Sequence, residues 1–116
     1  MKLHRALILG AAIACFATSA LSADQKTQDL YKSKCQGCHG ADGNSVAPAN
    51  PNLAGQGADY ITLQLMHFKA GVRVNPTMQA MAAPLSDDDM CALGVYFEQQ
   101  KPKDIGAKDP KFVKAG

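Results

Sequence analysis

The chain has 116 residues, of which 47% are hydrophobic and 19% are charged, and its formal net charge is +2. This length gives room for one domain, and the composition is ordinary for a globular protein, which excludes a fibrous or largely disordered chain. The small net charge leaves no excess of cations for a phosphate backbone, so nucleic-acid binding has no support.

The first 23 residues have the layout of a secretory signal peptide. Lys2 and Arg5 precede a long apolar run, and small, weakly polar residues follow it. We expect a signal peptide over 1–22, cleaved after Ser22 or Ala23, and export to the periplasm. The alternative is an uncleaved membrane anchor, which needs about 20 apolar residues; the run reaches this length only if its polar flank is counted.

Residues 24–34 predict a helix that continues into the next segment, because they include good helix formers and neither Gly nor Pro. Residues 35–39 read Cys-Gln-Gly-Cys-His, the attachment motif of c-type heme. Two thiols at this spacing can form thioethers with the vinyl groups on one edge of a porphyrin, and the next histidine can ligate the iron. The sequence therefore predicts one covalently bound heme c, attached to Cys35 and Cys38 and ligated by His39.

Two other kinds of site also use a Cys-x-x-Cys pair. A thioredoxin-like redox pair expects a strand followed by a helix and needs no adjacent histidine. A zinc site needs two further ligands, and the candidates His67 and Cys91 lie far apart in the sequence. The adjacent histidine and the export signal together favour heme over both alternatives.

Turn residues and helical patterns alternate after the motif. Residues 40–57 hold several Gly, Pro and Asn and predict an irregular loop over the edge of the cofactor. Residues 58–72 predict a helix that ends near Gly71. Residues 73–84 contain two prolines and are expected to be irregular. The apolar stripe of the helix over 58–72 consists of Ile61, Leu65, Phe68 and Val72.

A last helix is predicted from the N-cap Ser86 to about Gln100, with three aspartates at the positive end of its dipole. Gly94 lowers helix stability and therefore indicates close approach of another helix, for which we expect the first helix. We expect the heme domain over 23–100 and a linker-like, lysine-rich tail over 101–116. The apolar stripe of this helix consists of Met90, Leu93 and Phe97.

Four methionines remain after export, and methionine sulfur is a known partner of histidine on the iron of c-type cytochromes. Met66 and Met90 lie in predicted helices, where methionine more often fills the core. Met78 and Met81 lie on the proline-bounded segment, which can cross the opposite heme face, and are the candidates for the second axial ligand. The alternative is that both only pack against the heme edge.

Longer motifs around these residues resemble those of a known family. They follow one another in the same order over nearly the whole mature chain. On these motifs the chain resembles the class I c-type cytochromes, and within them the N-terminal half of the diheme cytochrome c4 family. The motifs are Cys35–Gly40 with Asp42–Ser45, Pro51–Gly57, Tyr60, Gln64–Leu65, Phe68–Gly71, Met78–Ala82 with Leu85–Asp87, and Ala92–Leu93 with Tyr96–Phe97.

The resemblance implies an all-α, class I cytochrome c fold with helices wrapped around one covalently bound heme. It implies Met78 as the axial methionine, with Met81 as the alternative. It also implies that the carbonyl of Pro51 accepts a hydrogen bond from the ring N–H of His39 and so orients the ligand. Diheme members continue through a linker into a second heme domain, so this sequence implies either a single-heme member or a shortened copy.

The function that the resemblance implies is electron transfer without a substrate. We expect a periplasmic, single-heme electron carrier of a respiratory chain and not an enzyme. Its partners would be redox proteins such as a membrane cytochrome complex or a terminal oxidase, and no small-molecule substrate is expected. Two alternatives stay open: a heme-based gas sensor or heme enzyme with an open sixth coordination site, and an electron-entry subunit of a larger oxidoreductase.

Overall fold

A computed structural model describes residues 24–103 of the chain. The expected signal peptide and residues 104–116 of the expected tail lie outside this range. The described residues form helices and no strand, so the prediction of an all-α fold is confirmed. None of these helices is long and apolar enough to cross a membrane. The helices are α1 (Gln25–Lys34), α2 (Gln36–His39), α3 (Ala58–Lys69), α4 (Pro76–Ala82) and α5 (Asp87–Gln99).

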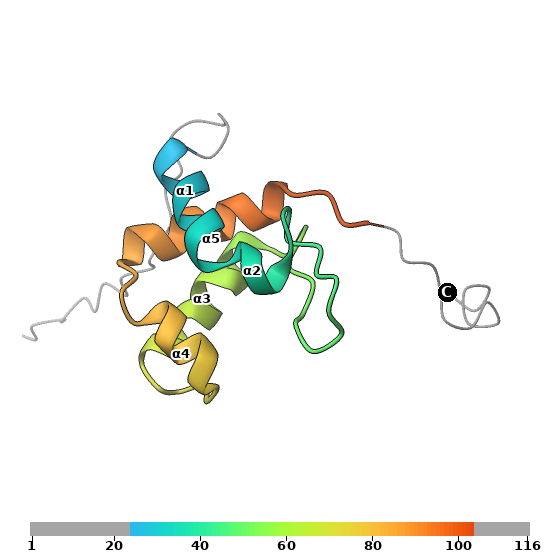
Figure 1. Ribbon diagram of the computed structural model, residues 1–116. Helices are drawn as coiled ribbons and strands as arrows, with labels where there is room; N and C mark the ends of the chain where they lie inside the picture. The colour runs from blue at the N-terminus through green and yellow to red at the C-terminus, as the bar shows by residue number, and fades with distance from the viewer. Residues whose placement is uncertain (1–23, 104–116) are drawn as a thin grey trace, which may run out of the picture.

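The helices enclose one hydrophobic core. In Figure 1, α5 crosses the middle of the molecule, α1 and α2 lie above and in front of it, α4 lies below, and the loop over 40–57 extends to the right. α3 packs against both α5 and α4, and α1 packs against α5. The buried apolar side chains of this core are Tyr31, Ile61, Leu65, Phe68, Ala82, Leu85, Met90, Leu93 and Phe97.

The first helix begins and continues as its sequence predicts. The carboxylate of Asp24 accepts a hydrogen bond from the Thr27 backbone N–H at 2.8 Å, which caps the N-terminus of α1. At the other end, a single turn residue, Cys35, joins α1 to α2. The helix therefore runs directly into the attachment motif.

Gly71 ends α3, as the sequence predicts, but the helix does not reach Val72. Gly71 adopts a φ of +74°, and the Val72 N–H bonds to the carbonyl oxygen of His67 at 2.9 Å, which is the pattern of a Schellman motif. The helix therefore ends at Lys69, before the fourth residue of the predicted stripe. The placement of Val72 in that stripe is wrong: its side chain is 70% exposed.

The proline-bounded segment contains a short helix, α4, where we expected irregular chain. Pro76 occupies the first turn of this helix, where a missing backbone N–H costs nothing. The side chain of Asn75 accepts from the Met78 N–H at 3.0 Å and caps the helix. The two prolines thus bound the helix instead of interrupting it, and the expectation of an irregular segment is wrong.

The predicted start of α5 is confirmed. Ser86 Oγ accepts from the Asp89 N–H, and the Asp89 carboxylate accepts from the Ser86 N–H, both at 3.1 Å, which forms a capping box. The backbone bond from Ser86 and the ion pair with Lys26 at 3.1 Å lower the pKa of Asp89. The aspartates at this helix start therefore serve the helix, as their position predicts.

Gly94 permits close approach of α3 and not of α1. An added Cβ would lie 2.5 Å from the carbonyl oxygen of Ala58 and 2.6 Å from Thr62 Oγ1. The first helix contacts α5 through Tyr31 and Tyr96, whose ring centroids are 4.5 Å apart. Residues two apart do not share a helix face, so Gly94 and Tyr96 serve different neighbours. The expectation that the first helix lies against Gly94 is therefore wrong.

Substituting Gly94→Ala should destabilise the protein although alanine is the better helix former. The methyl group would overlap a backbone oxygen that cannot move freely, and such overpacking costs about 1–3 kcal/mol. Denaturant unfolding should show this loss. The matched control is Gly57→Ala, where an added Cβ meets nothing within 4 Å; an equal loss in both variants would contradict the close approach of α3.

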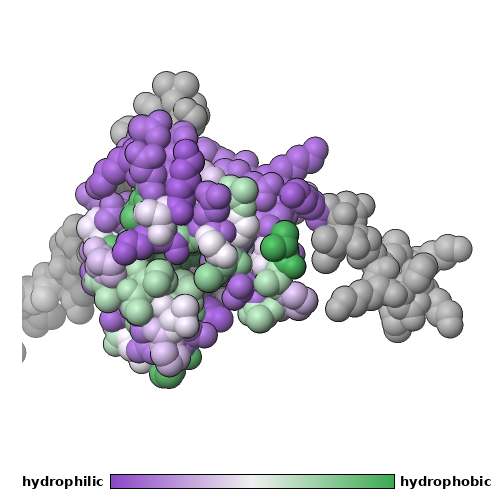
Figure 2. Space-filling model, viewed as in Figure 1, coloured by the Kyte–Doolittle hydropathy of each residue, from purple (hydrophilic) through white to green (hydrophobic). Residues whose placement is uncertain are grey.

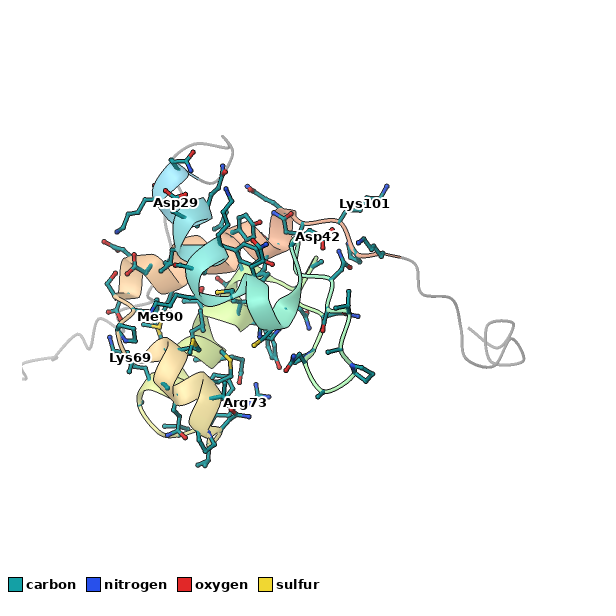
Figure 3. All side chains as sticks on the ribbon, in the orientation of Figure 1. Asp29, Asp42, Lys69, Arg73, Met90 and Lys101 are labelled. Atoms are coloured by element: carbon teal, nitrogen blue, oxygen red, sulfur yellow. The ribbon has the colours of Figure 1, made fainter. Side chains whose placement is uncertain are left out.

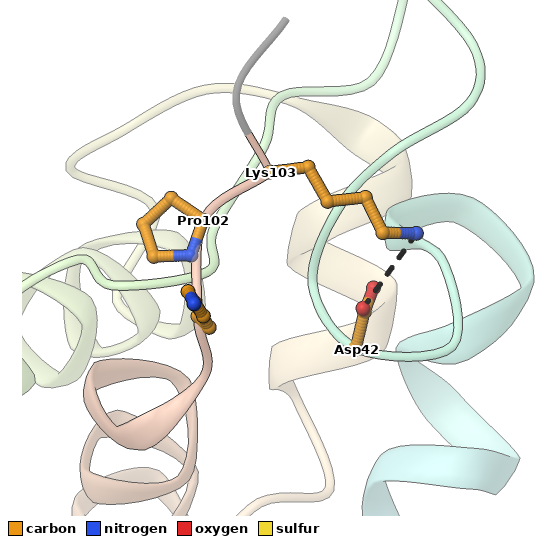
Figure 4. A pocket seen from close by; sticks show the side chains of 4 residues that line it. Asp42, Pro102 and Lys103 are labelled. Atoms are coloured by element: carbon orange, nitrogen blue, oxygen red, sulfur yellow. Dashed lines mark ion pairs between the residues drawn. The ribbon is translucent and has the colours of Figure 1, made fainter.

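The chain that leaves α5 stays attached to the domain as far as the structure describes it. The Asn44 side chain donates to the Lys101 carbonyl at 3.1 Å and accepts from the Lys103 N–H at 2.9 Å. Figure 4 shows the surface hollow beside this segment, where Lys103 Nζ lies 3.8 Å from the carboxylate of Asp42. These contacts lie beyond residue 100, where we expected the domain to end.

Candidate heme-binding site

The attachment motif brings two thiols and one imidazole together on a single turn. The Cys35 N–H closes the last turn of α1 by bonding to the Tyr31 carbonyl at 2.8 Å, and the His39 N–H bonds to the Cys35 carbonyl at 3.0 Å. The thiols of Cys35 and Cys38 are free; Cys35 is half-buried and Cys38 is exposed. The His39 side chain points inward and is only 7% exposed.

The state of the Cys35 thiol argues against a dithiol redox site. Burial raises its pKa to about 11, and the neighbouring Cys38 adds to the shift. A thioredoxin-like pair depends on a thiol whose pKa is lowered, and it follows a strand, whereas Cys35 follows a helix. Zinc is also disfavoured, because residues 24–103 contain no group of three or more potential ligands from His, Cys, Asp and Glu.

The loop over 40–57 orients the histidine. Nδ1 of His39 lies 2.9 Å from the carbonyl oxygen of Pro51, the pair that the resemblance implies. Donation from Nδ1 to this oxygen leaves Nε2 available for a metal. The loop is closed by the carbonyl of Gly43, which accepts from the N–H groups of Leu53 and Ala54 at 2.8 and 3.1 Å.

The Tyr31 hydroxyl fixes the first turn of this loop, a role that sequence reasoning missed. It donates to the carbonyl of Gly40 and accepts from the Gly43 N–H at 2.9 Å. Burial raises the pKa of Tyr31 to about 12, so the hydroxyl keeps its proton. Tyr31 lies inside the helix that the sequence predicts over 24–34, and no local pattern indicates a bond to residues that follow the motif.

Substituting Tyr31→Phe should cost about 1–3 kcal/mol of unfolding free energy, because two backbone groups of the loop would lose their partner in the interior. Thermal or denaturant unfolding of the holoprotein measures this loss. Tyr60→Phe is the control, since Tyr60 is half exposed and its hydroxyl can bond to water. Equal stabilities of the two variants would contradict the role of Tyr31.

An apolar pocket opens beside the motif. Its volume is about 540 Å³, within the usual range of cofactor pockets, and its lining includes Cys35, Cys38 and His39. In Figure 2, hydrophilic surface covers the upper part of the molecule, and hydrophobic surface gathers in the centre and below. The apolar walls of the pocket come from Leu53, Ile61, Leu65, Phe68, Leu85, Leu93 and Phe97.

Both candidate methionines reach the pocket. Met78 and Met81 are three residues apart on α4, so they share one helix face, and both line the pocket with His39. Met78 also packs against the hydrophobic core, whereas Met81 is 36% exposed. Met90 is fully buried in the core, as its helical position predicts.

The donor set, the fold and the pocket together fit a heme. Two thiols and an imidazole lie on one side, methionine sulfurs are available from α4, and the walls are apolar. A helical domain with this attachment motif and this pocket is a c-type cytochrome domain, and its cofactor is covalently bound heme c.

Comparisons with known proteins agree with this class. Residues 22–97 match the family model described as cytochrome C oxidase, cbb3-type, subunit III. The chain is 43% identical over 91 residues to cytochrome c4 of Azotobacter vinelandii, an alignment that covers 71% of this chain and 43% of the relative. It is 45% identical over 74 residues to the thiosulfate dehydrogenase electron acceptor of Stutzerimonas stutzeri, covering 63% of this chain and 34% of the relative.

A solved structure extends the comparison to the fold. Reduced recombinant cytochrome c4 from Pseudomonas stutzeri aligns with a TM-score of 0.68 and 38% identity, covering 81% of this chain and 53% of that chain. The protein therefore belongs to the family of the matched model, cytochrome C oxidase, cbb3-type, subunit III, and its resemblance to cytochrome c4 is confirmed. It spans less than half the length of the two curated relatives named above.

Proposed function

We propose that this protein is an exported electron carrier, and not an enzyme, in which His39 and Met78 are the axial ligands of the heme iron. One observation carries the proposal: a buried imidazole and two methionines line the same apolar pocket beside the attachment cysteines. When bound, the heme supplies an iron that changes between the ferric and ferrous states. With a protein ligand on each face of the heme, the iron would have no coordination position left for a substrate.

The side chains around the pocket have separate tasks in this proposal. Cys35 and Cys38 hold the cofactor covalently. The carbonyl of Pro51 orients the His39 ring, and apolar walls keep water from the site. Met78 is favoured over Met81 because its packing against the core fixes its position, whereas Met81 is more exposed.

Redox proteins are the proposed partners. One relative is named as the electron acceptor of a thiosulfate dehydrogenase, which supports exchange of electrons with a protein donor. A membrane cytochrome complex or a terminal oxidase is a fitting acceptor. The proposed location is the periplasm, on the basis of the basic and apolar pattern of residues 1–22.

Carbon monoxide tests the closed coordination. The reduced holoprotein at neutral pH should give the same optical spectrum with and without the gas, because Met78 occupies the sixth position. A gas sensor or a heme enzyme with an open position would bind carbon monoxide tightly, and its spectrum would change. That result would replace the carrier by the alternative function.

A second candidate function is an electron-entry subunit, which the description of the matched family as an oxidase subunit favours. A subunit would co-purify with a membrane oxidoreductase in a fixed ratio after gentle solubilisation. A freely diffusing carrier would be recovered alone and would reduce or oxidise its partners in a salt-dependent manner.

A further inference from the structure

The side chain of Asn44 binds the chain that follows α5 to the loop over 40–57. It is only 8% exposed, and both ends of its amide are used. Nδ2 donates to the carbonyl oxygen of Lys101 at 3.1 Å, and Oδ1 accepts from the N–H of Lys103 at 2.9 Å. Figure 3 shows Asp42, two residues before Asn44, next to Lys101. Since an unpaired end of a buried amide is costly, losing either partner would weaken this connection.

The chain neighbours of Asn44 bind the other side of the loop. The carbonyl of Gly43 accepts from the two N–H groups of residues 53–54, at 2.8 and 3.1 Å. The Ser45 N–H donates to Oδ1 of Asn52 at 2.7 Å. These contacts lie within three residues of the proline whose carbonyl orients the heme ligand. The position of Asn44 therefore determines the position of that proline.

The series of hydrogen bonds ends at the imidazole of His39. Asn52 follows Pro51 directly in the chain, and the Pro51 carbonyl oxygen lies 2.9 Å from Nδ1 of His39. Donation from Nδ1 makes the imidazole a stronger ligand, which favours ferric iron and so lowers the reduction potential. Printed contacts thus connect Lys103, through Asn44, to the ring that faces the pocket.

A close backbone approach holds the same two segments together at a second point. The Gly55 N–H donates to the Phe97 carbonyl in the last turn of α5, at 2.8 Å. Gly55 has a φ of +77°, and an added Cβ would lie 2.6 Å from Cγ of Pro102. The chain after α5 is therefore packed onto the loop on both sides of Pro51.

We propose that Asn44 is a positioning residue for the heme ligand His39. By binding Lys101 and Lys103 it fixes the loop that presents the Pro51 carbonyl, and it makes the reduction potential depend on how the chain after α5 is held. This inference rests on the proposed function, in which His39 is an axial ligand, and is independent of which methionine ligates the iron.

Nuclear magnetic resonance of the holoprotein tests the role of Asn44 at the ring itself. In the oxidised protein the paramagnetic iron shifts the resonance of the His39 Nδ1 proton, and exchange of this proton with water measures how often it leaves the Pro51 carbonyl. Asn44→Ala should speed this exchange about tenfold, because two hydrogen bonds that keep the loop closed are lost. It should also raise the reduction potential, because the imidazole becomes a weaker ligand.

Two variants of Lys103 test the connection from the other segment. Lys103→Pro removes the N–H from which Asn44 accepts, whereas Lys103→Ala keeps it. Both variants lose the same ammonium group and its contact with Asp42, so the change of charge is matched. Lys103→Pro should speed exchange of the His39 proton and raise the potential relative to Lys103→Ala. Lys103→Ala should exchange this proton at the wild-type rate.

The outcomes separate the role of Asn44 from a general loss of stability and from the proposed function. Ser86→Ala is the control for stability, because it removes the cap of α5 and leaves the loop contacts intact. Equal exchange in wild type and Asn44→Ala, equal exchange in the two Lys103 variants, or the same acceleration in Ser86→Ala would overturn the proposal. A wild type whose His39 proton shows no paramagnetic shift would overturn His39 as a ligand, whereas a shifted proton that exchanges equally in all variants overturns only the role of Asn44.

Discussion

Substituting both Cys35→Ala and Cys38→Ala should abolish cooperative unfolding. Without thioethers the cofactor is not retained, and the pocket of about 540 Å³ loses the apolar surface that fills it. Several of its walls, including Ile61, Leu65 and Phe68, also belong to the core, so an unfilled pocket leaves a cavity beside the core. A domain of this size has little other apolar burial to compensate, and a bound ligand stabilises only the folded state.

Circular dichroism and thermal unfolding measure this effect. The double variant should show reduced helix content and a broad, weak transition. The matched control is Gly57→Ala, which keeps both thiols, lies outside the pocket and places its Cβ in open space. This control should retain heme and a sharp transition. A double variant that unfolds as sharply as the control would show that the helices pack adequately without the cofactor.

Local sequence signals were sufficient for much of the fold. The heme motif depends on residues that are close in the chain, and so does the capping box of Ser86 and Asp89. The stripe Met90, Leu93 and Phe97 is buried as its spacing predicts. In each case the residues that determine the structure lie within a few turns of one another, so a single sequence contains the whole signal.

Contacts between segments that lie far apart in the sequence could not be predicted from it. Gly94 indicates a close approach, but the sequence does not say that the approaching helix is α3. The Tyr31 hydroxyl bonds to residues 9 and 12 positions away across the motif. The two prolines of residues 73–84 predict a break in helical structure, whereas in the structure the first one starts α4 and Asn75 caps it.

The same limit applies to the site. The motif predicts Cys35, Cys38 and His39 from their spacing alone. The pairing of Pro51 with His39 follows from a resemblance to known proteins. In the structure, Nδ1 of His39 lies 2.9 Å from the carbonyl oxygen of Pro51. Arg73 also lines the pocket, but it belongs to none of the motifs named above, so no sequence pattern indicates its place there.

The second large effect is expected when the axial methionine is replaced. Met78→Ala should remove the optical band that arises from sulfur-to-iron charge transfer in the oxidised protein. It should also lower the reduction potential and open the reduced iron to carbon monoxide, because a thioether ligand favours the reduced state and occupies the sixth position. Met81→Ala should keep the band and stay inert to the gas.

These two variants are matched in chemistry, since both remove one methionine from the same face of α4. They differ in packing. Met78 contacts the hydrophobic core, so Met78→Ala also lowers the free energy of unfolding by about 2–5 kcal/mol. Met81 is more exposed, so Met81→Ala lowers it by less. Stability alone therefore cannot assign the ligand. Loss of the band in Met81→Ala with retention in Met78→Ala would transfer the ligand role to Met81, and retention in both would show that the two side chains only pack against the heme edge.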